Sequence, residues 1–91
     1  MADINIKRAH GRSLEEARQI AQMLMDKLEA QFDVKHRWDG DVLRFQRSGV
    51  EGQVAVTPTD LQITAKLGLL LKALRGRIES EVNSVLDRKL G

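Results

Sequence analysis

The sequence predicts an α+β fold in which two helices pack on one face of a five-stranded antiparallel sheet. Short stretches alternate apolar with polar residues, which is the period of half-buried strands. Two longer stretches instead repeat apolar residues every three or four positions, as amphipathic helices do. The order is strand, helix, four strands, helix, and residues 1–91 suit a single domain with one core.

The first strand and the first helix are separated by a clear break. Residues 3–8 alternate, and the pattern stops before Gly11. Ser13 and Glu16 then have the spacing of a capping box, in which each side chain accepts a hydrogen bond from the other residue's backbone amide. We therefore expect the helix over residues 14–31.

Short links separate the next four strands. The Asp39-Gly40 pair suits a tight turn that needs positive φ, and further turns are expected at Ser48-Gly49 and at Pro58. Gly52 lies inside a strand, where glycine indicates a bulge or a close backbone approach. Links this short predict an antiparallel meander, with the first strand pairing beside the last.

The last strand is expected to run directly into a long amphipathic helix. Alternation ends at Lys66, and no turn residue separates it from the helical spacing that follows. The helix should fold back across the sheet, which resembles a shortened helix-grip architecture. Its buried stripe would consist of Leu67, Leu71, Leu74, Ile78, Val82 and Val85.

Composition and charge place loose limits on the function. The net charge of +2 favours nucleic-acid binding only if the cations gather on one face. The chain has no cysteine, which is compatible with a reducing compartment. The amino terminus lacks the apolar segment of a signal peptide, and no stretch is long enough to span a bilayer. A cytoplasmic protein is therefore expected.

No catalytic, cofactor or metal-binding motif is found. His10 and His36 fall in different elements and have no second ligand at a metal-binding spacing. Asp39 and Asp41 flank a hairpin glycine, where solvated turn residues are the usual occupants. We expect no metal, no cofactor and no enzyme.

The outward face of the sheet is the first candidate binding surface. A basic sheet face can bind the phosphates of single-stranded nucleic acid, but such platforms also carry aromatic rings on which bases stack. Phe32, Trp38 and Phe45 are all expected to point inward, so a merely solvated face is the favoured alternative. The basic sheet face consists of Lys7, Lys35, Arg37, Arg44 and Lys66.

A ledge on the last helix is the second candidate. Leu69, Ala73 and Gly76 follow at i, i+4 and i+7, and small residues beside a leucine leave a shallow groove for another helix or chain. Gly76 costs about 1 kcal/mol of helix stability relative to alanine, which close packing would offset. The alternative is an incidental exposed leucine. The predicted contact face, for self-association or a partner, is Leu69, Leu70, Ala73, Arg75, Gly76 and Arg77.

Several stretches together resemble a small bacterial family of polyhydroxyalkanoic acid system proteins. They are residues 2–8, 43–50 and 65–71, together with His10, Glu16-Ala17-Arg18, Gly52 and residues 76–79. The family is named for genes that lie among those for storage-polyester synthesis and use in proteobacteria. The resemblance implies a role near this pathway and supplies no catalytic residues.

The leading hypothesis is a non-enzymatic accessory or regulatory protein of polyhydroxyalkanoate metabolism. It would act by protein or granule-surface contact, since a polyester granule presents an apolar surface to which exposed leucines can bind. Self-association of the protein is also expected. Two alternatives stay open. One is nucleic-acid binding by the basic sheet face, and the other is capture of a hydroxyacyl chain between the sheet and the last helix.

Overall fold

A computed structural model describes residues 3–90, apart from the side chain of Leu70. Five strands, two α-helices and one 3₁₀ helix (η1) make up this part of the chain. In chain order they are β1 (Ile4–Ala9), α1 (Leu14–Phe32), β2 (Lys35–Asp39), β3 (Val42–Arg47), β4 (Val50–Val56), β5 (Asp60–Leu67), η1 (Leu69–Leu74) and α2 (Arg75–Leu90).

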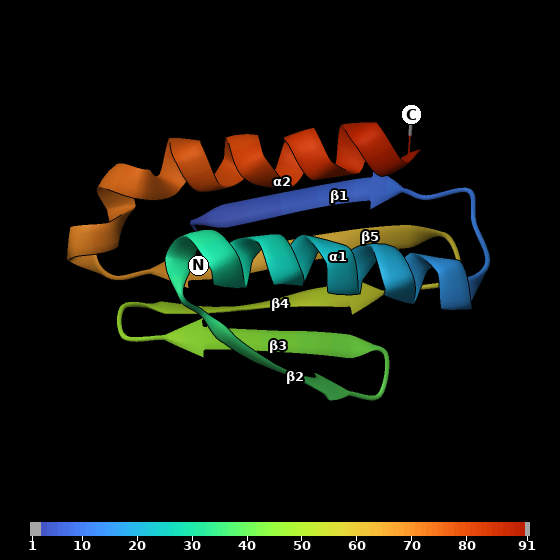
Figure 1. Ribbon diagram of the computed structural model, residues 1–91, viewed down its shortest axis with the longest axis horizontal. Helices are drawn as coiled ribbons and strands as arrows, with labels where there is room; N and C mark the ends of the chain where they lie inside the picture. Colours follow the sequence, from blue (N-terminus) through green and yellow to red (C-terminus); the bar gives the residue numbers. More distant parts are fainter. Residues whose placement is uncertain (1–2, 91) are drawn as a thin grey trace.

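The strands form one antiparallel sheet in the order β1-β5-β4-β3-β2. Both α-helices lie on the same side of this sheet, α1 over its middle and α2 beside β1 (Figure 1). The predicted α+β class, the meander and the pairing of the first strand with the last are confirmed. Among residues 3–90, no helix covers the opposite face of the sheet.

The core lies between the sheet and the helices because apolar residues alternate along each strand. Leu43, Val54 and Ile63 on neighbouring strands are fully or almost fully buried, and so are Leu24 of α1 and Leu86 of α2. Burying each such side chain stabilises the fold by about 1.5–3 kcal/mol. The strand residues between them point to the other face and are half-buried or exposed.

Helix α1 begins at the predicted capping box. The Ser13 hydroxyl accepts a hydrogen bond from the Glu16 amide at 3.1 Å, and the Glu16 carboxylate accepts one from the Ser13 amide at 3.5 Å. Asp33 caps the other end of the helix, with a left-handed φ of 55° and an amide that donates to the Glu29 carbonyl. The observed end at Phe32 is one residue beyond the prediction.

Gly52 marks a close approach and not a bulge. The register is continuous, with Gly52 opposite Phe45 on β3 and Ala65 on β5. A Cβ at this position would lie 2.6 Å from the Phe45 ring and 2.5 Å from the Thr64 carbonyl oxygen. The ring of Phe45 therefore packs directly over the glycine, in space that a side chain would otherwise fill.

The predicted helix start at Leu67 is wrong. Strand β5 continues through Leu67, Gly68 is extended, and the chain then forms η1 before α2 begins at Arg75. The cause is a contact between distant segments, because the Gly68 amide donates to the Gly49 carbonyl at 2.7 Å and so holds the chain against the β3–β4 turn. Of the predicted stripe, Leu67, Val82 and Val85 are buried, and Leu71, Leu74 and Ile78 are half-buried.

Candidate contact surfaces

The first candidate surface is the corner that η1 forms between β5 and α2, at one end of the molecule (Figure 1). A 3₁₀ helix has three residues per turn, so side chains three positions apart line up. Leu69, Lys72 and Arg75 are all exposed at this spacing, whereas Leu71 and Leu74 turn inward. We call the exposed line of Leu69, Lys72 and Arg75 the η1 ridge.

The ridge differs from the predicted ledge in its composition. Leu69, Ala73 and Gly76 are each exposed, but they do not form one helical line, because residue 69 lies in a 3₁₀ segment and the α-helix begins only at Arg75. A Cβ at Gly76 would meet nothing within 4 Å, so the glycine is not explained by packing within the described chain. The side chain of Leu70 lies outside the described residues.

The two arginines of the predicted contact face have partners within the chain. Arg75 donates to the Glu79 carboxylate at 2.9 Å, one helical turn away. The guanidinium of Arg77 lies 5.8 Å from the centre of the Phe32 ring, at the end of α1. Arg77 therefore joins the two helices and is not a free cation beside Gly76, whereas Arg75 keeps its exposed position on the ridge.

The corner is fixed to the sheet through Asp3. Its carboxylate accepts a hydrogen bond from the Leu67 amide at 2.8 Å, and its other oxygen lies 3.8 Å from the Lys72 ammonium. The Leu67 amide lowers the pKa of Asp3 by binding the ionised form, and the positive charge of Lys72 lowers it further, while desolvation opposes both. The turn also packs closely, since a Cβ at Gly49 would lie 3.0 Å from Leu71.

The second candidate surface is the uncovered face of the sheet. Lys7, Lys35, Arg37, Arg44 and Lys66 are all exposed there, as the alternation predicts. Phe45 lies beneath this face but is buried in the core, and Phe32 and Trp38 pack against that core. Cross-strand pairing sets polar residues in rows, one running Arg37, Arg44, Gln53, Thr64 and the next Lys35, Gln46, Glu51, Lys66.

This face is hollowed along its strands. One hollow of about 930 Å³ lies over the middle strands, and a second of about 720 Å³ lies toward the β3–β4 turn. Both are lined by Lys35, Gln46, Glu51 and Lys66, so they form one continuous depression that we call the sheet groove. Neither hollow lies between the sheet and α2, where apolar side chains fill the space, so the hydroxyacyl-capture hypothesis gains no support.

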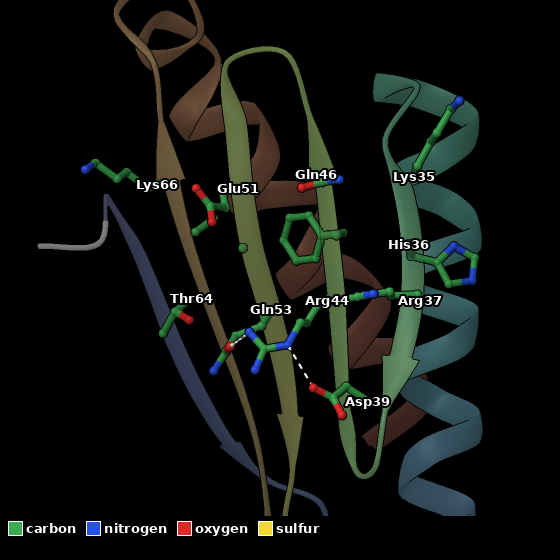
Figure 2. Close-up of a pocket in the computed structure, with 13 residues that line it drawn as sticks. Lys35, His36, Arg37, Asp39, Arg44, Gln46, Glu51, Gln53, Thr64 and Lys66 are labelled. Atoms are coloured by element: carbon green, nitrogen blue, oxygen red, sulfur yellow. Dashed lines mark hydrogen bonds and ion pairs between the residues drawn. The ribbon is translucent and has the colours of Figure 1, made fainter.

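Two arginines dominate the middle of the sheet groove. Arg37 and Arg44 are directly opposite each other on β2 and β3, and both lean toward β4 in Figure 2. Arg44 donates to Gln53 at 3.2 Å and to Asp39 at 3.4 Å. Arg37 has no hydrogen-bonding or ionic partner in the part of the chain that the structure describes.

A polar network between α1 and β2 was not predicted from the sequence. The Trp38 indole N–H donates to the Gln22 carbonyl oxygen at 2.8 Å, which leaves the Gln22 amide to donate to Asp26 and to His36 Nε2. His36 Nδ1 then donates to Glu29. Because both ring nitrogens are engaged, His36 serves to hold β2 against α1.

His10 is also engaged on both sides. It is buried, its Nε2 donates to the Thr57 carbonyl at 2.8 Å, and its Nδ1 accepts from the Arg12 amide at 2.9 Å. This arrangement sets a neutral tautomer and ties the segment after β1 to the β4–β5 turn. The burial of His10 could not be predicted from the sequence, because Thr57, which accepts its Nε2 hydrogen bond, lies 47 positions away.

The fold defines a small two-layer α+β protein with two candidate contact surfaces, the η1 ridge and the sheet groove. A protein-family model described as "Putative polyhydroxyalkanoic acid system protein" matches residues 4–90, and the chain belongs to this family. Neither the curated proteins nor the solved structures include a match to the chain. Within residues 3–90, no helix is long and apolar enough to cross a membrane.

Proposed function

We propose that this protein is a non-enzymatic accessory protein of polyhydroxyalkanoate metabolism that docks on the storage-granule surface through the η1 ridge. The exposure of Leu69 is the observation that carries this proposal. Its side chain is 86% exposed, against 43% for Met23 and 36% for Leu14, the other large exposed apolar residues described. The family supplies the polyester context.

The chemistry of the ridge suits a polyester surface. A polyester is apolar along most of its length and carries carboxylates at chain ends, so a leucine beside two cations can meet both features. Lys72 and Arg75 follow Leu69 along the ridge at the 3₁₀ spacing. The Gly68–Gly49 hydrogen bond holds this backbone in place before binding, which reduces the entropy that docking must remove.

A single leucine binds a granule surface weakly, so we propose that the protein also self-associates. Burying a leucine side chain is worth about 1.5–3 kcal/mol, which is less than the approximately 4 kcal/mol of a millimolar complex. Several copies joined on one granule would bind far more tightly through effective concentration. The partner in self-association is a second copy of this chain.

Co-sedimentation with washed polyester granules tests the proposal. The wild-type protein is expected in the granule pellet, and Leu69→Asp is expected to remain in the supernatant. Met23→Asp makes the same chemical change on α1 and should sediment like the wild type. A wild-type protein that stays in the supernatant, or a Leu69→Asp variant that pellets normally, would contradict granule docking. Sedimentation velocity without granules measures self-association separately.

A further inference from the structure

We infer that the sheet groove is a recognition site for an extended acidic segment of a partner protein. The groove lies on the face opposite the helices and does not include Leu69, so this inference is independent of granule docking. It depends on three features of the described residues: an arginine pair of which only Arg44 has a carboxylate partner, the shape of the depression, and the burial of Phe45, the aromatic residue that lines it.

The arginine pair is the centre of the site. Like charges directly opposite each other on neighbouring strands repel, and Arg37 and Arg44 are such a pair. Asp39 approaches Arg44 only at 3.4 Å, and Arg37 has no partner among residues 3–90. A carboxylate placed over both guanidinium groups would relieve the repulsion and accept paired N–H hydrogen bonds.

The shape of the groove fits an extended peptide. The depression runs parallel to β3 and β4. Asp39 of β2 lines one end of it, and Gly68, just after β5, lines the other. A strand of seven residues such as β4 spans about 23 Å at 3.3 Å per residue. The amides of Gln46 and Gln53 line it and can bond a peptide backbone. Figure 2 shows Lys35 and Lys66 at its two sides, both pointing outward.

The chemistry favours a peptide over single-stranded nucleic acid. Phe45 lines the groove but is only 5% exposed and belongs to the core, so its ring offers little surface on which a base could stack. Glu51 and Asp39 interrupt the cations, which disfavours an evenly charged phosphate backbone. A peptide can place its carboxylates over the arginines and a neutral residue beside Glu51.

Fluorescence anisotropy with a labelled eight-residue peptide that alternates glutamate and glutamine tests the inference. The wild-type protein should bind this probe at low salt, more weakly as salt rises, and should not bind octaglutamine. Arg37→Gln with Arg44→Gln should weaken binding about tenfold or more. Lys27→Gln with Arg88→Gln removes the same charge from exposed helical positions and should leave binding unchanged. Glu51→Gln should tighten binding by about two- to fivefold.

Three results would overturn the inference. They are no binding of the glutamate–glutamine peptide at low salt, an equal loss in the helical control, and binding of an oligothymidylate as tightly as the acidic peptide. Circular dichroism of each variant must match the wild type, and all four substituted cations are exposed. Because the groove variants retain Leu69, their granule sedimentation should be normal, which separates this test from that of granule docking.

Discussion

The carboxylate of Asp3 and the backbone amide of Leu67 are joined by a 2.8 Å hydrogen bond that closes one end of the sheet. The same carboxylate faces Lys72 on η1 at 3.8 Å. One side chain next to β1 thus meets the last residue of β5 and the last turn of η1. The position of the η1 ridge relative to the sheet depends on this contact between residues 64 positions apart.

The Asp3 contact predicts part of the acid sensitivity of the fold. The lowered pKa of Asp3 means that the folded state binds its proton less readily than the unfolded state. Its stabilisation is therefore full above about pH 4 and is lost as the pH falls through the lower folded pKa. Urea unfolding of Asp3→Asn should show a smaller loss of stability on acidification than the wild type. Equal losses in both proteins would contradict this assignment.

Gly52→Ala is expected to destabilise the protein by about 1–3 kcal/mol, because a core that is already filled must shift to admit the methyl group. The new Cβ would meet the Phe45 ring at 2.6 Å and the Thr64 carbonyl at 2.5 Å, and backbone cannot move aside as a flexible side chain does. Urea denaturation measures the change. Unaltered stability would show that Phe45 does not pack over the glycine.

Replacing Gly76 by alanine is expected to have the opposite effect on the stability of the protein. Gly76 lies in the first turn of α2, and a methyl group added there would meet nothing within 4 Å, so Gly76→Ala should stabilise the protein by about 0.5–1 kcal/mol. Granule sedimentation of this variant should be unchanged if the η1 ridge is the contact. A loss of sedimentation would instead favour the close-packed ledge of Leu69, Ala73 and Gly76.

Arg37→Gln is expected to stabilise the isolated protein by about 0.2–1 kcal/mol while weakening acidic-peptide binding, because it removes a like charge opposite Arg44. The gain should shrink at high salt, where charges on an exposed sheet face are screened. Thermal unfolding at two salt concentrations measures both effects. A destabilised variant, or a gain that does not depend on salt, would show that repulsion from Arg44 is not the cause.

Local patterns predicted most of the fold because the physics that sets them is local. The alternation that ends at Lys66 predicted a strand, and the Ser13–Glu16 spacing predicted a helix start. The corner was missed for the opposite reason. Leucines three and four positions apart suit both a 3₁₀ and an α-helix, and what decides between them here is the contact of Gly68 with Gly49, which no local pattern reveals.

The residues of the candidate surfaces were predicted from the sequence, but their arrangement on each surface was not. Period-two alternation placed Arg37 and Arg44 on the outer face, but their direct opposition depends on the strand register. The exposure of Leu69 followed from its position off the buried stripe, whereas its alignment with Lys72 follows from the 3₁₀ turn. Which residues share a face was readable from the sequence, and which of them become neighbours was not.

Labelling of lysines on granule-bound protein tests the central claim most directly. With an amine-reactive reagent and mass spectrometry, docking through the η1 ridge predicts that Lys72 becomes protected on granules while Lys27, on the exposed surface of α1, reacts as it does in free protein. Equal reactivity of Lys72 in bound and free protein would contradict the account. Protection of Lys35 and Lys66 instead would place the granule contact in the sheet groove.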